Sequence, residues 1–286
     1  MSHHSPGAVL VTGCSSGIGE ATARYLLLAG HTVYATARRP ETLEALSDAG
    51  ATTLALDVTD ESSMRAAVDR VVADHGRVGT LVNNAGYGAY GTIEEVPIED
   101  VRAMYETNVF GLAGLCQLVL PSMRRAGGGR IINIGSMGGR MTFPVGGYYH
   151  STKYAVEAIT DALRNEVRGF GVDVVLVEPG MIRTRFEETI SGSTAMTPEH
   201  IAASPYRGFL TRAVETQTKA YANRVMGAGP ESVAKVVLRA VEAEQPRSRY
   251  LTTVLGKGLV HARRLGGDRV WDAVVRAQYG STGAEG

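Results

Sequence analysis

The sequence has few cysteines, no excess of charge of either sign and no long apolar run. Its 286 residues include two cysteines, Cys14 and Cys116, which lie far apart. A disulfide framework is therefore not expected, and we predict a reducing, cytoplasmic location. Lys+Arg and Asp+Glu number 29 each, so nothing indicates binding to nucleic acid or to an anionic membrane surface.

Membrane and metal signals are also missing. No apolar run approaches the roughly 20 residues of a membrane span, and the N-terminal "MSHHSPG" lacks the positive start and apolar stretch of a signal peptide. His3 and His4 have no further potential ligands near them in the sequence, and we expect no metal site.

The sequence does contain a regular alternation of short β-branched runs with longer amphipathic stretches. Strands are predicted at 8–12, 31–37, 52–58, 79–86, 129–136, 172–180 and 249–253. Helices are predicted at 20–30, 41–50, 60–75, 98–125, 148–168 and 230–244 and at the C-terminus, with a looser stretch at 181–228. Strands that are apolar throughout and alternate with helices indicate a parallel sheet covered on both faces. We therefore predict an α/β fold with one doubly wound domain over residues 1–286 and about seven strands.

The first turn of this pattern, "TGCSSGIG" at residues 12–19, is rich in glycine. Gly13, Gly17 and Gly19 permit positive φ and a close approach of the backbone, so free N–H groups can face a pyrophosphate. Ser15 and Ser16 add hydroxyl donors for the same anion. The alternative is a glycine-rich turn with no ligand. The strand before the turn and the helix after it favour the phosphate-binding interpretation.

The glycine spacing of this turn resembles the cofactor loop of the short-chain dehydrogenase/reductase family. Five further segments resemble motifs of that family in the same order: "NNAG" (83–86), "TNVFG" (107–111), "IGSMGG" (134–139), "YYHSTK" (148–153) and "EPGMIRT" (178–184). The resemblance covers roughly residues 8–184. It implies a Rossmann-type sheet, a nicotinamide dinucleotide and hydride transfer.

Two adjacent tyrosines in "YYHSTK" compete for the catalytic role. On a helix, residues i and i+4 share a face, whereas i and i+5 are displaced by ~140°. Tyr149 lies four residues before Lys153, so these two can point into one cleft, while Tyr148 points elsewhere. We predict that Tyr149 is the working acid, that Tyr148 is a packing or pocket-wall residue, and that His150 is solvated or at an interface.

Charge predicts how the tyrosine works. A free tyrosine has a pKa near ~10, and the nearby ammonium of Lys153, like an oxidised nicotinamide, is expected to lower the pKa of Tyr149. The resemblance implies that Lys153 also binds the nicotinamide ribose, that Ser136 hydrogen-bonds the reacting oxygen, and that Asn108 holds a water that links Lys153 to solvent. The ordinary alternatives are a buried helix amide for Asn108 and a strand-end turn for Ser136.

The end of the second strand predicts the form of the cofactor. NAD-binding sheets carry a carboxylate about 20 residues beyond the glycines, which holds the adenosine ribose. Here Ala37 stands at that position and is followed by Arg38 and Arg39. Guanidinium groups bind phosphate in a bidentate manner, so the sequence favours NADP, with Arg38 on the 2′-phosphate.

The resemblance assigns further residues to the cofactor. It implies that Asp57 accepts a hydrogen bond from the adenine amine and that Ile182 and Thr184 contact the carboxamide. The remaining predicted cofactor contacts are Ile18, Val58, Asn84, Ala85, Gly86, Pro179 and Gly180.

The predicted substrate is a lipophilic alcohol or ketone. Residues 141–149 and the variable region 181–228 are expected to frame the pocket mouth, with a C-terminal extension at 254–286. Several of their side chains are apolar, namely Met141, Phe143, Pro144, Val145, Met181 and Phe186. The chain also resembles the family's branch that handles steroids, retinoids and similar lipophilic alcohols or ketones. Together with the preference for NADP, this predicts an NADP(H)-dependent oxidoreductase. The alternatives are a catalytically silent NADP-binding sensor and a redox-neutral enzyme such as an epimerase or dehydratase.

The predicted assembly is a homodimer or homotetramer. The helices at 98–125 and 148–168 carry apolar residues on two adjoining stripes, which is more than one face against a sheet requires. The family commonly pairs these helices across a two-fold axis. The alternative is that the second stripe packs on a neighbouring helix of the same chain.

Overall fold

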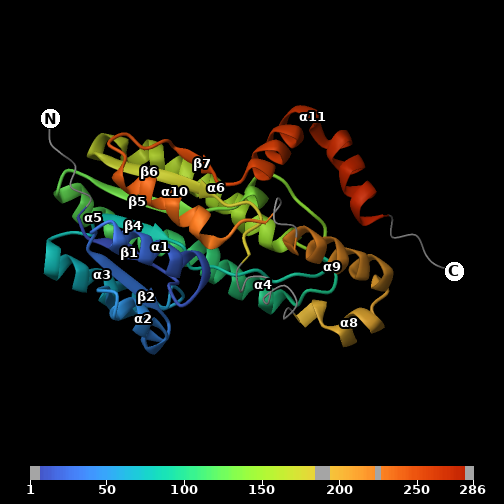
Figure 1. The fold of residues 1–286 in the computed structure, drawn as a ribbon, viewed down its shortest axis with the longest axis horizontal. Helices are drawn as coiled ribbons and strands as arrows, with labels where there is room; N and C mark the ends of the chain where they lie inside the picture. The colour runs from blue at the N-terminus through green and yellow to red at the C-terminus, as the bar shows by residue number, and fades with distance from the viewer. Residues whose placement is uncertain (1–6, 184–193, 223–226, 281–286) are drawn as a thin grey trace.

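The structure is a computed structural model that describes residues 7–183, 194–222 and 227–280. Within these residues, seven parallel strands form one sheet in the order β3-β2-β1-β4-β5-β6-β7 (Figure 1). The strands are β1 (Val9–Val11), β2 (Val33–Ala37), β3 (Thr52–Ala55), β4 (Thr80–Asn83), β5 (Gly129–Ile134), β6 (Val172–Glu178) and β7 (Arg249–Leu251). The doubly wound prediction is confirmed. The chain reverses direction across the sheet between β1 and β4, where such sheets bind ligands.

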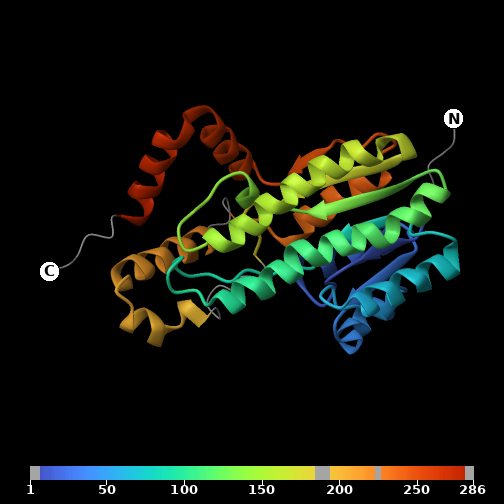
Figure 2. The same cartoon turned by 180° about the vertical axis from the view of Figure 1, so that it is seen from behind.

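Helices cover both faces of the sheet. One face carries α1 (Gly17–Leu28), α2 (Glu44–Ser47) and α10 (Pro230–Glu242). The other carries α3 (Glu61–His75), α5 (Gly111–Arg125) and α6 (Gly147–Val167), which lie in front of the sheet in Figure 2. Successive strand residues alternate between the two cores: Val174 packs on the α6 side and Val175 on the α10 side. Burial on both faces explains why the strands are apolar throughout.

Several predicted strands end early. The runs predicted at 8–12, 52–58 and 79–86 stop pairing at Val11, Ala55 and Asn83. The residues beyond these points turn away from the sheet and form loops at its carboxyl edge. Those loops build the cavity described below.

The predicted helix at 98–125 is continuous but irregular. It begins as α4 (Ile98–Tyr105), widens into a π-helical turn at Glu106–Phe110 and continues as α5. Turns of this kind inside α-helices are frequent at functional sites. Asn108 lies in the π-helical turn and is buried.

The region 181–228 is not as loose as predicted. Its described part contains α8 (Pro198–Ala203) and α9 (Arg207–Ala222). Thr197 caps α8 by accepting a hydrogen bond from the backbone N–H of His200. The stretch predicted to be looser is thus helical over much of its described part, and the sequence analysis overlooked this cap.

The C-terminal helix α11 (Val254–Tyr279) is bent into two arms at Gly267, whose φ is 64° and ψ is −168°. The two arms form the inverted V at the top of Figure 1. None of the described helices combines the length and the apolar character that crossing a bilayer requires.

Candidate active site

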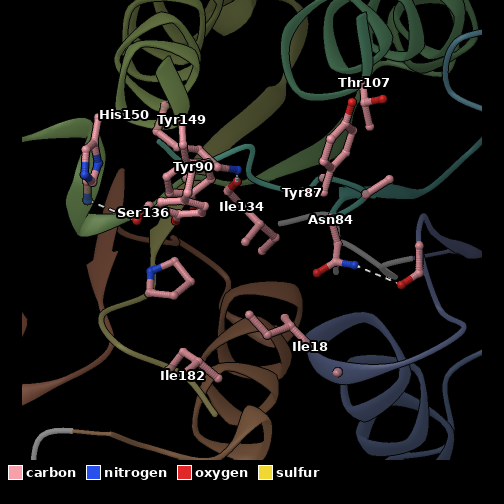
Figure 3. Close-up of a pocket in the computed structure, with 18 of the residues that line it drawn as sticks. Ile18, Asn84, Tyr87, Tyr90, Thr107, Ile134, Ser136, Tyr149, His150 and Ile182 are labelled. Carbon is pink, nitrogen blue, oxygen red and sulfur yellow. Dashed lines mark hydrogen bonds between the residues drawn. The ribbon is translucent and has the colours of Figure 1, made fainter. Parts of the chain in front are cut away.

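A cavity of about 940 Å³ lies along the carboxyl ends of the strands, at the reversal point of the sheet. Figure 3 shows Ser136, Tyr149 and Tyr90 grouped at one end, with Ile18 and Asn84 at the other. Among the described residues predicted for the site, all line this cavity except Gly19 and Asn108. Thr184 and Phe186 lie outside the described residues.

The glycine loop forms one end of the cavity. Gly13 and Gly17 adopt φ of 71° and 62°, in the left-handed region that favours glycine. A Cβ on Gly19 would overlap the carbonyl oxygen of Gly13 and the side-chain amide of Asn84. Gly19 therefore lies behind the loop and permits its close approach to the helix.

The first turn of α1 faces the same end of the cavity. Ser16 precedes the helix with an extended backbone, but its side chain makes no capping hydrogen bond. The first N–H groups of the helix are thus left without a cap from Ser16, and these groups and the helix dipole suit an anion. The tight loop and this helix end fit the pyrophosphate of a dinucleotide.

Asn84 ties the loop to the sheet. Its Nδ2 donates to the carbonyls of Thr12 (2.8 Å) and Gly13 (3.2 Å). Thr12 Oγ1 in turn accepts from the backbone N–H groups of Asn84 and Ala85, both at 3.0 Å. Sequence reasoning missed Thr12, whose position at the strand end was the available signal.

Arg38 and Asp57 lie on the cavity wall at the ends of β2 and β3. Arg38 is exposed, with Ala37 rather than an acid before it. Asp57 Oδ1 accepts from the backbone N–H (2.9 Å) and hydroxyl (2.7 Å) of Thr59, which fixes the carboxylate. Arg39 is not among the lining residues. A cation at the end of β2, with no acid beside it in the sequence, fits a 2′-phosphate better than a bare ribose.

Tyr149 and Ser136 meet at the other end. The hydroxyl of Ser136 hydrogen-bonds Tyr149 and also accepts from the Gly138 N–H at 3.0 Å. Burial raises the pKa of Tyr149 to about 12, and the hydrogen bond from Ser136 opposes this rise. The phenol is therefore protonated at neutral pH.

Lys153 does not lower the pKa of Tyr149 as expected. Its Nζ donates to the carbonyl of Ile134 at 3.0 Å and lies 5.9 Å from the centroid of the Tyr149 ring. Burial also lowers the pKa of Lys153 itself to about 8. The prediction was wrong because it weighed the charge of Lys153 and left out the loss of solvent around the phenol, which has the larger effect here.

Asn108 does not face the cavity. Its Nδ2 donates to the Tyr87 carbonyl (2.8 Å) and to Thr152 Oγ1 (3.1 Å), and its Oδ1 accepts from the Tyr87 N–H (3.0 Å). Thr152 Oγ1 donates to the Tyr149 carbonyl at 2.7 Å. Asn108 thus connects the loop after β4 to the helical turn that carries Tyr149.

The two neighbours of Tyr149 in sequence have different environments. Tyr148 lies outside the cavity lining, and its hydroxyl donates to the Ile93 carbonyl at 3.1 Å. His150 is buried and lines the cavity, so its prediction as a solvated or interface residue was wrong. Its ring fits between Gly138 and Gly146, where any Cβ would overlap ring nitrogens. Burial lowers the pKa of His150 to about 4, so the imidazole is neutral.

The remaining wall of the cavity, the far wall, is formed by segments that contain none of the family's motifs. Phe143 and Met181 line it as predicted, but Met141 and Val145 are buried in the core. Pro144 is not among the lining residues. The additional lining residues from the loop after β4, from α9 and from α11 are Tyr87, Tyr90, Thr216, Gln217, Ala220, Leu259, Gln278 and Tyr279.

The end of α11 is held against α9. Arg212 Nε donates to the carbonyl of Tyr279 at 3.1 Å, and the rings of Phe209 and Tyr279 lie 6.2 Å apart. This contact brings Gln278 and Tyr279 to the cavity. Gln217 Oε1 is buried there and has no hydrogen-bond partner within the part of the chain that the structure describes.

Several known proteins are similar to this chain in sequence. A 3-ketodihydrosphingosine reductase of Bacteroides thetaiotaomicron is 42% identical over 183 residues, which are 64% of this chain and 66% of that protein. The uncharacterized oxidoreductase YbbO of Escherichia coli is 34% identical over 94% of both chains. Human 17-beta-hydroxysteroid dehydrogenase type 1 is 36% identical over 86% of this chain and 77% of its own length.

Solved structures share the fold. A short-chain dehydrogenase from Streptomyces avermitilis superimposes with a TM-score of 0.76 and 33% identity, covering 96% of this chain and 99% of its own. A serine dehydrogenase complexed with NADP+ superimposes with a TM-score of 0.73 and 29% identity, covering 85% of this chain and 93% of its own. A short chain dehydrogenase/reductase from Burkholderia phymatum in complex with NAD superimposes with a TM-score of 0.75 and 25% identity. It covers 93% of this chain and 95% of its own.

The family described as short chain dehydrogenase matches residues 7–194. This range contains the sheet from β1 to β6, the glycine loop, Ser136, Tyr149 and Lys153. The chain belongs to the short-chain dehydrogenase/reductase family of oxidoreductases.

Proposed function

We propose that the protein is an NADP(H)-dependent oxidoreductase that transfers hydride between the nicotinamide and a lipophilic ketone or alcohol. One observation carries this proposal: Ser136, Tyr149 and Lys153 line the same cavity as the glycine loop and the uncapped end of α1. A proton donor and a dinucleotide site thus share one enclosed space.

The bound cofactor supplies the hydride, and the chain's own residues handle the proton. In the direction of reduction, Tyr149 donates its phenolic proton to the carbonyl oxygen as negative charge develops there. Ser136, whose hydroxyl hydrogen-bonds Tyr149 in the structure, turns its one proton to the same oxygen when the substrate is bound. The raised pKa keeps Tyr149 protonated, which suits an acid. Lys153 would hold the nicotinamide ribose hydroxyls.

NADP is proposed over NAD on the basis of Arg38. Arg38 lies on the cavity wall at the end of β2, and Ala37 stands where an NAD-binding sheet carries the carboxylate that would repel a 2′-phosphate. The related serine dehydrogenase, which binds NADP+, supports the assignment. The neighbour complexed with NAD shows that the fold alone does not decide it.

A lipophilic substrate is proposed on the basis of the far wall. Tyr90, Phe143, Leu259 and Tyr279 give this part of the cavity an apolar surface. The unpartnered Oε1 of Gln217 adds one acceptor for a substrate hydroxyl or amine. The names of two relatives, a 3-ketodihydrosphingosine reductase and a 17-beta-hydroxysteroid dehydrogenase, point to substrates of this kind.

A cytoplasmic location completes the proposal. Cys14 and Cys116 are free and buried, and burial raises the pKa of both thiols to about 12. Cysteines that form no disulfide fit a reducing compartment.

The test is a panel of lipophilic ketones and alcohols, read by the absorbance of NADPH. We expect turnover with a subset of the panel and none with Tyr149→Phe. A protein that binds NADPH but turns over no member of a broad panel would instead be a silent cofactor-binding protein.

A further inference from the structure

A second polar cluster lies directly behind the active site. Glu157 follows Lys153 by one helical turn and Tyr149 by two, on the same face of α6. Glu178 is the last residue of β6, next to the cavity-lining Pro179. The two glutamates are 7% and 1% exposed. Carboxyl groups are almost never buried to this extent unless they are paired.

Each glutamate uses one oxygen in an ion pair. Glu157 Oε2 lies 3.0 Å from Arg249 on β7, and Glu178 Oε1 lies 3.3 Å from Arg140 in the loop after β5. The other two oxygens, Glu157 Oε1 and Glu178 Oε2, are buried and receive no hydrogen bond from any other described residue. Two buried oxygens without donors are costly unless they satisfy each other.

The two carboxyl groups lie close enough for a hydrogen bond between them to raise the pKa of Glu157. Ionised carboxylates are acceptors only, so this bond requires a proton on one of them. Burial, followed by the contact with Glu178, raises the pKa of Glu157 to about 8, while Arg249 and Arg140 oppose the rise. A proton held between the pair at neutral pH accounts for both unpartnered oxygens.

The positive charges around the two glutamates do not remove the need for this proton. Arg249 is divided between Glu157 and Asp161, which lies 2.5 Å from it and also pairs with Arg164. Arg140 forms its ion pair with Glu178 and is itself 30% exposed. Lys153, the other cation on this face of α6, donates to the Ile134 carbonyl instead. Two full negative charges in this place would therefore be poorly compensated.

We propose that Glu157 and Glu178 share one proton and that this protonated pair is a positioning unit for the active site. It joins three segments that carry site residues. Glu178 leads into Pro179, whose carbonyl accepts from the N–H of Met137 at 2.8 Å. Gly139, in the loop that begins with Ser136, packs so tightly on α6 that a Cβ would lie 2.8 Å from the Lys153 carbonyl and 2.9 Å from Glu157 Cγ.

The sign of the pH dependence follows from the raised pKa. The unfolded chain releases this proton near the ordinary pKa of 4.5, whereas the folded chain keeps it until about 8. The stabilisation is thus complete below about pH 4.5 and is lost progressively as the pH rises to about 8. Glu157→Gln, whose amide donates permanently to Glu178, does not show this loss.

Infrared difference spectroscopy of the full-length protein tests the shared proton without any substrate. At neutral pH we expect the C=O band of a protonated carboxylic acid, absent from both Glu157→Gln and Glu178→Gln and retained in Glu166→Gln, an exposed glutamate of the same helix. If the wild type lacks this band, or if both cluster variants keep it, the shared proton does not exist.

Thermal unfolding and activity test the positioning role. The difference in Tm between Glu157→Gln and wild type should grow from about pH 5 to about pH 8 and then level off. We expect Glu157→Gln to keep kcat within about two-fold and Glu157→Leu to lose about ten-fold or more, with a raised KM for NADPH. These activity expectations rest on the proposed function, whereas the infrared and Tm results do not.

The pH profile of kcat/KM separates positioning from stability. The activity of the wild type should decline above about pH 8, and this decline should be absent from Glu157→Gln. Lys153 has a similar pKa of about 8. A decline that persists unchanged in Glu157→Gln would belong to Lys153 and would contradict the positioning role.

Discussion

The substitution Tyr149→Phe removes one hydroxyl and leaves the ring in place. The ring packs 5.7 Å from that of Tyr90 and lines the cavity, and a phenylalanine keeps both contacts. The lost group is the proton donor, and general acid catalysis contributes about 10²–10⁴ in rate. We therefore expect kcat to fall by this factor, which corresponds to ~3–5 kcal/mol in the barrier. The Kd for NADPH should change by less than about two-fold.

The matched control is Tyr148→Phe, which makes the same change one residue earlier. Its hydroxyl donates to the Ile93 carbonyl at 3.1 Å, outside the cavity. Loss of this bond should cost about 0.5–1.5 kcal/mol of stability and leave kcat nearly unchanged. Steady-state rates and thermal unfolding of both variants provide the comparison. An inactive Tyr148→Phe beside an active Tyr149→Phe would refute the assignment based on the helix face.

Four further outcomes follow from the site and the fold. Arg38→Ala should raise the Kd for NADPH about 10–100-fold, because a charge-assisted bond is worth ~1.5–3 kcal/mol, and should hardly change the Kd for NADH. Titration measures both constants, and equal losses of affinity for the two cofactors would show that Arg38 does not contact the phosphate. Gly19→Ala should weaken cofactor binding and lower Tm because its Cβ would overlap the loop, whereas Gly169→Ala, with nothing within 4 Å, should do neither. Burial lowers the pKa of Lys153 to about 8, so stability relative to Lys153→Met should rise from about pH 8 to about pH 10, and a constant difference would contradict this burial effect. Light scattering should give two or four times the 30.3 kDa of one chain, and a single-chain mass on dilution would exclude the predicted oligomer.

The sequence predicted those parts of the molecule that depend on local pattern. Apolar runs of strand length predicted the seven strands and their alternation with helices, and the four-residue spacing predicted that Tyr149 and Lys153 share one cavity. Glycine spacing placed the loop between β1 and α1. In each case the information lies within a few residues, where backbone geometry alone decides the outcome.

The parts that were missed depend on contacts between distant segments. His150 is buried only because Gly138 and Gly146 leave room for its ring. Tyr279 reaches the cavity because Arg212 on another helix binds its carbonyl. The raised pKa of Tyr149 reflects burial by the assembled fold. No short window of sequence contains these relations.

The most direct test of hydride transfer is an isotope experiment. NADPH that carries deuterium at C4 of the nicotinamide is incubated with the protein and the ketone that gives the highest turnover, and the product is analysed by mass spectrometry and NMR. Hydride transfer predicts one deuterium on the carbinol carbon and an oxygen-bound proton from solvent. The cofactor is tested with deuterium on one face of C4 and then on the other. Product that lacks deuterium in both cases would contradict hydride transfer.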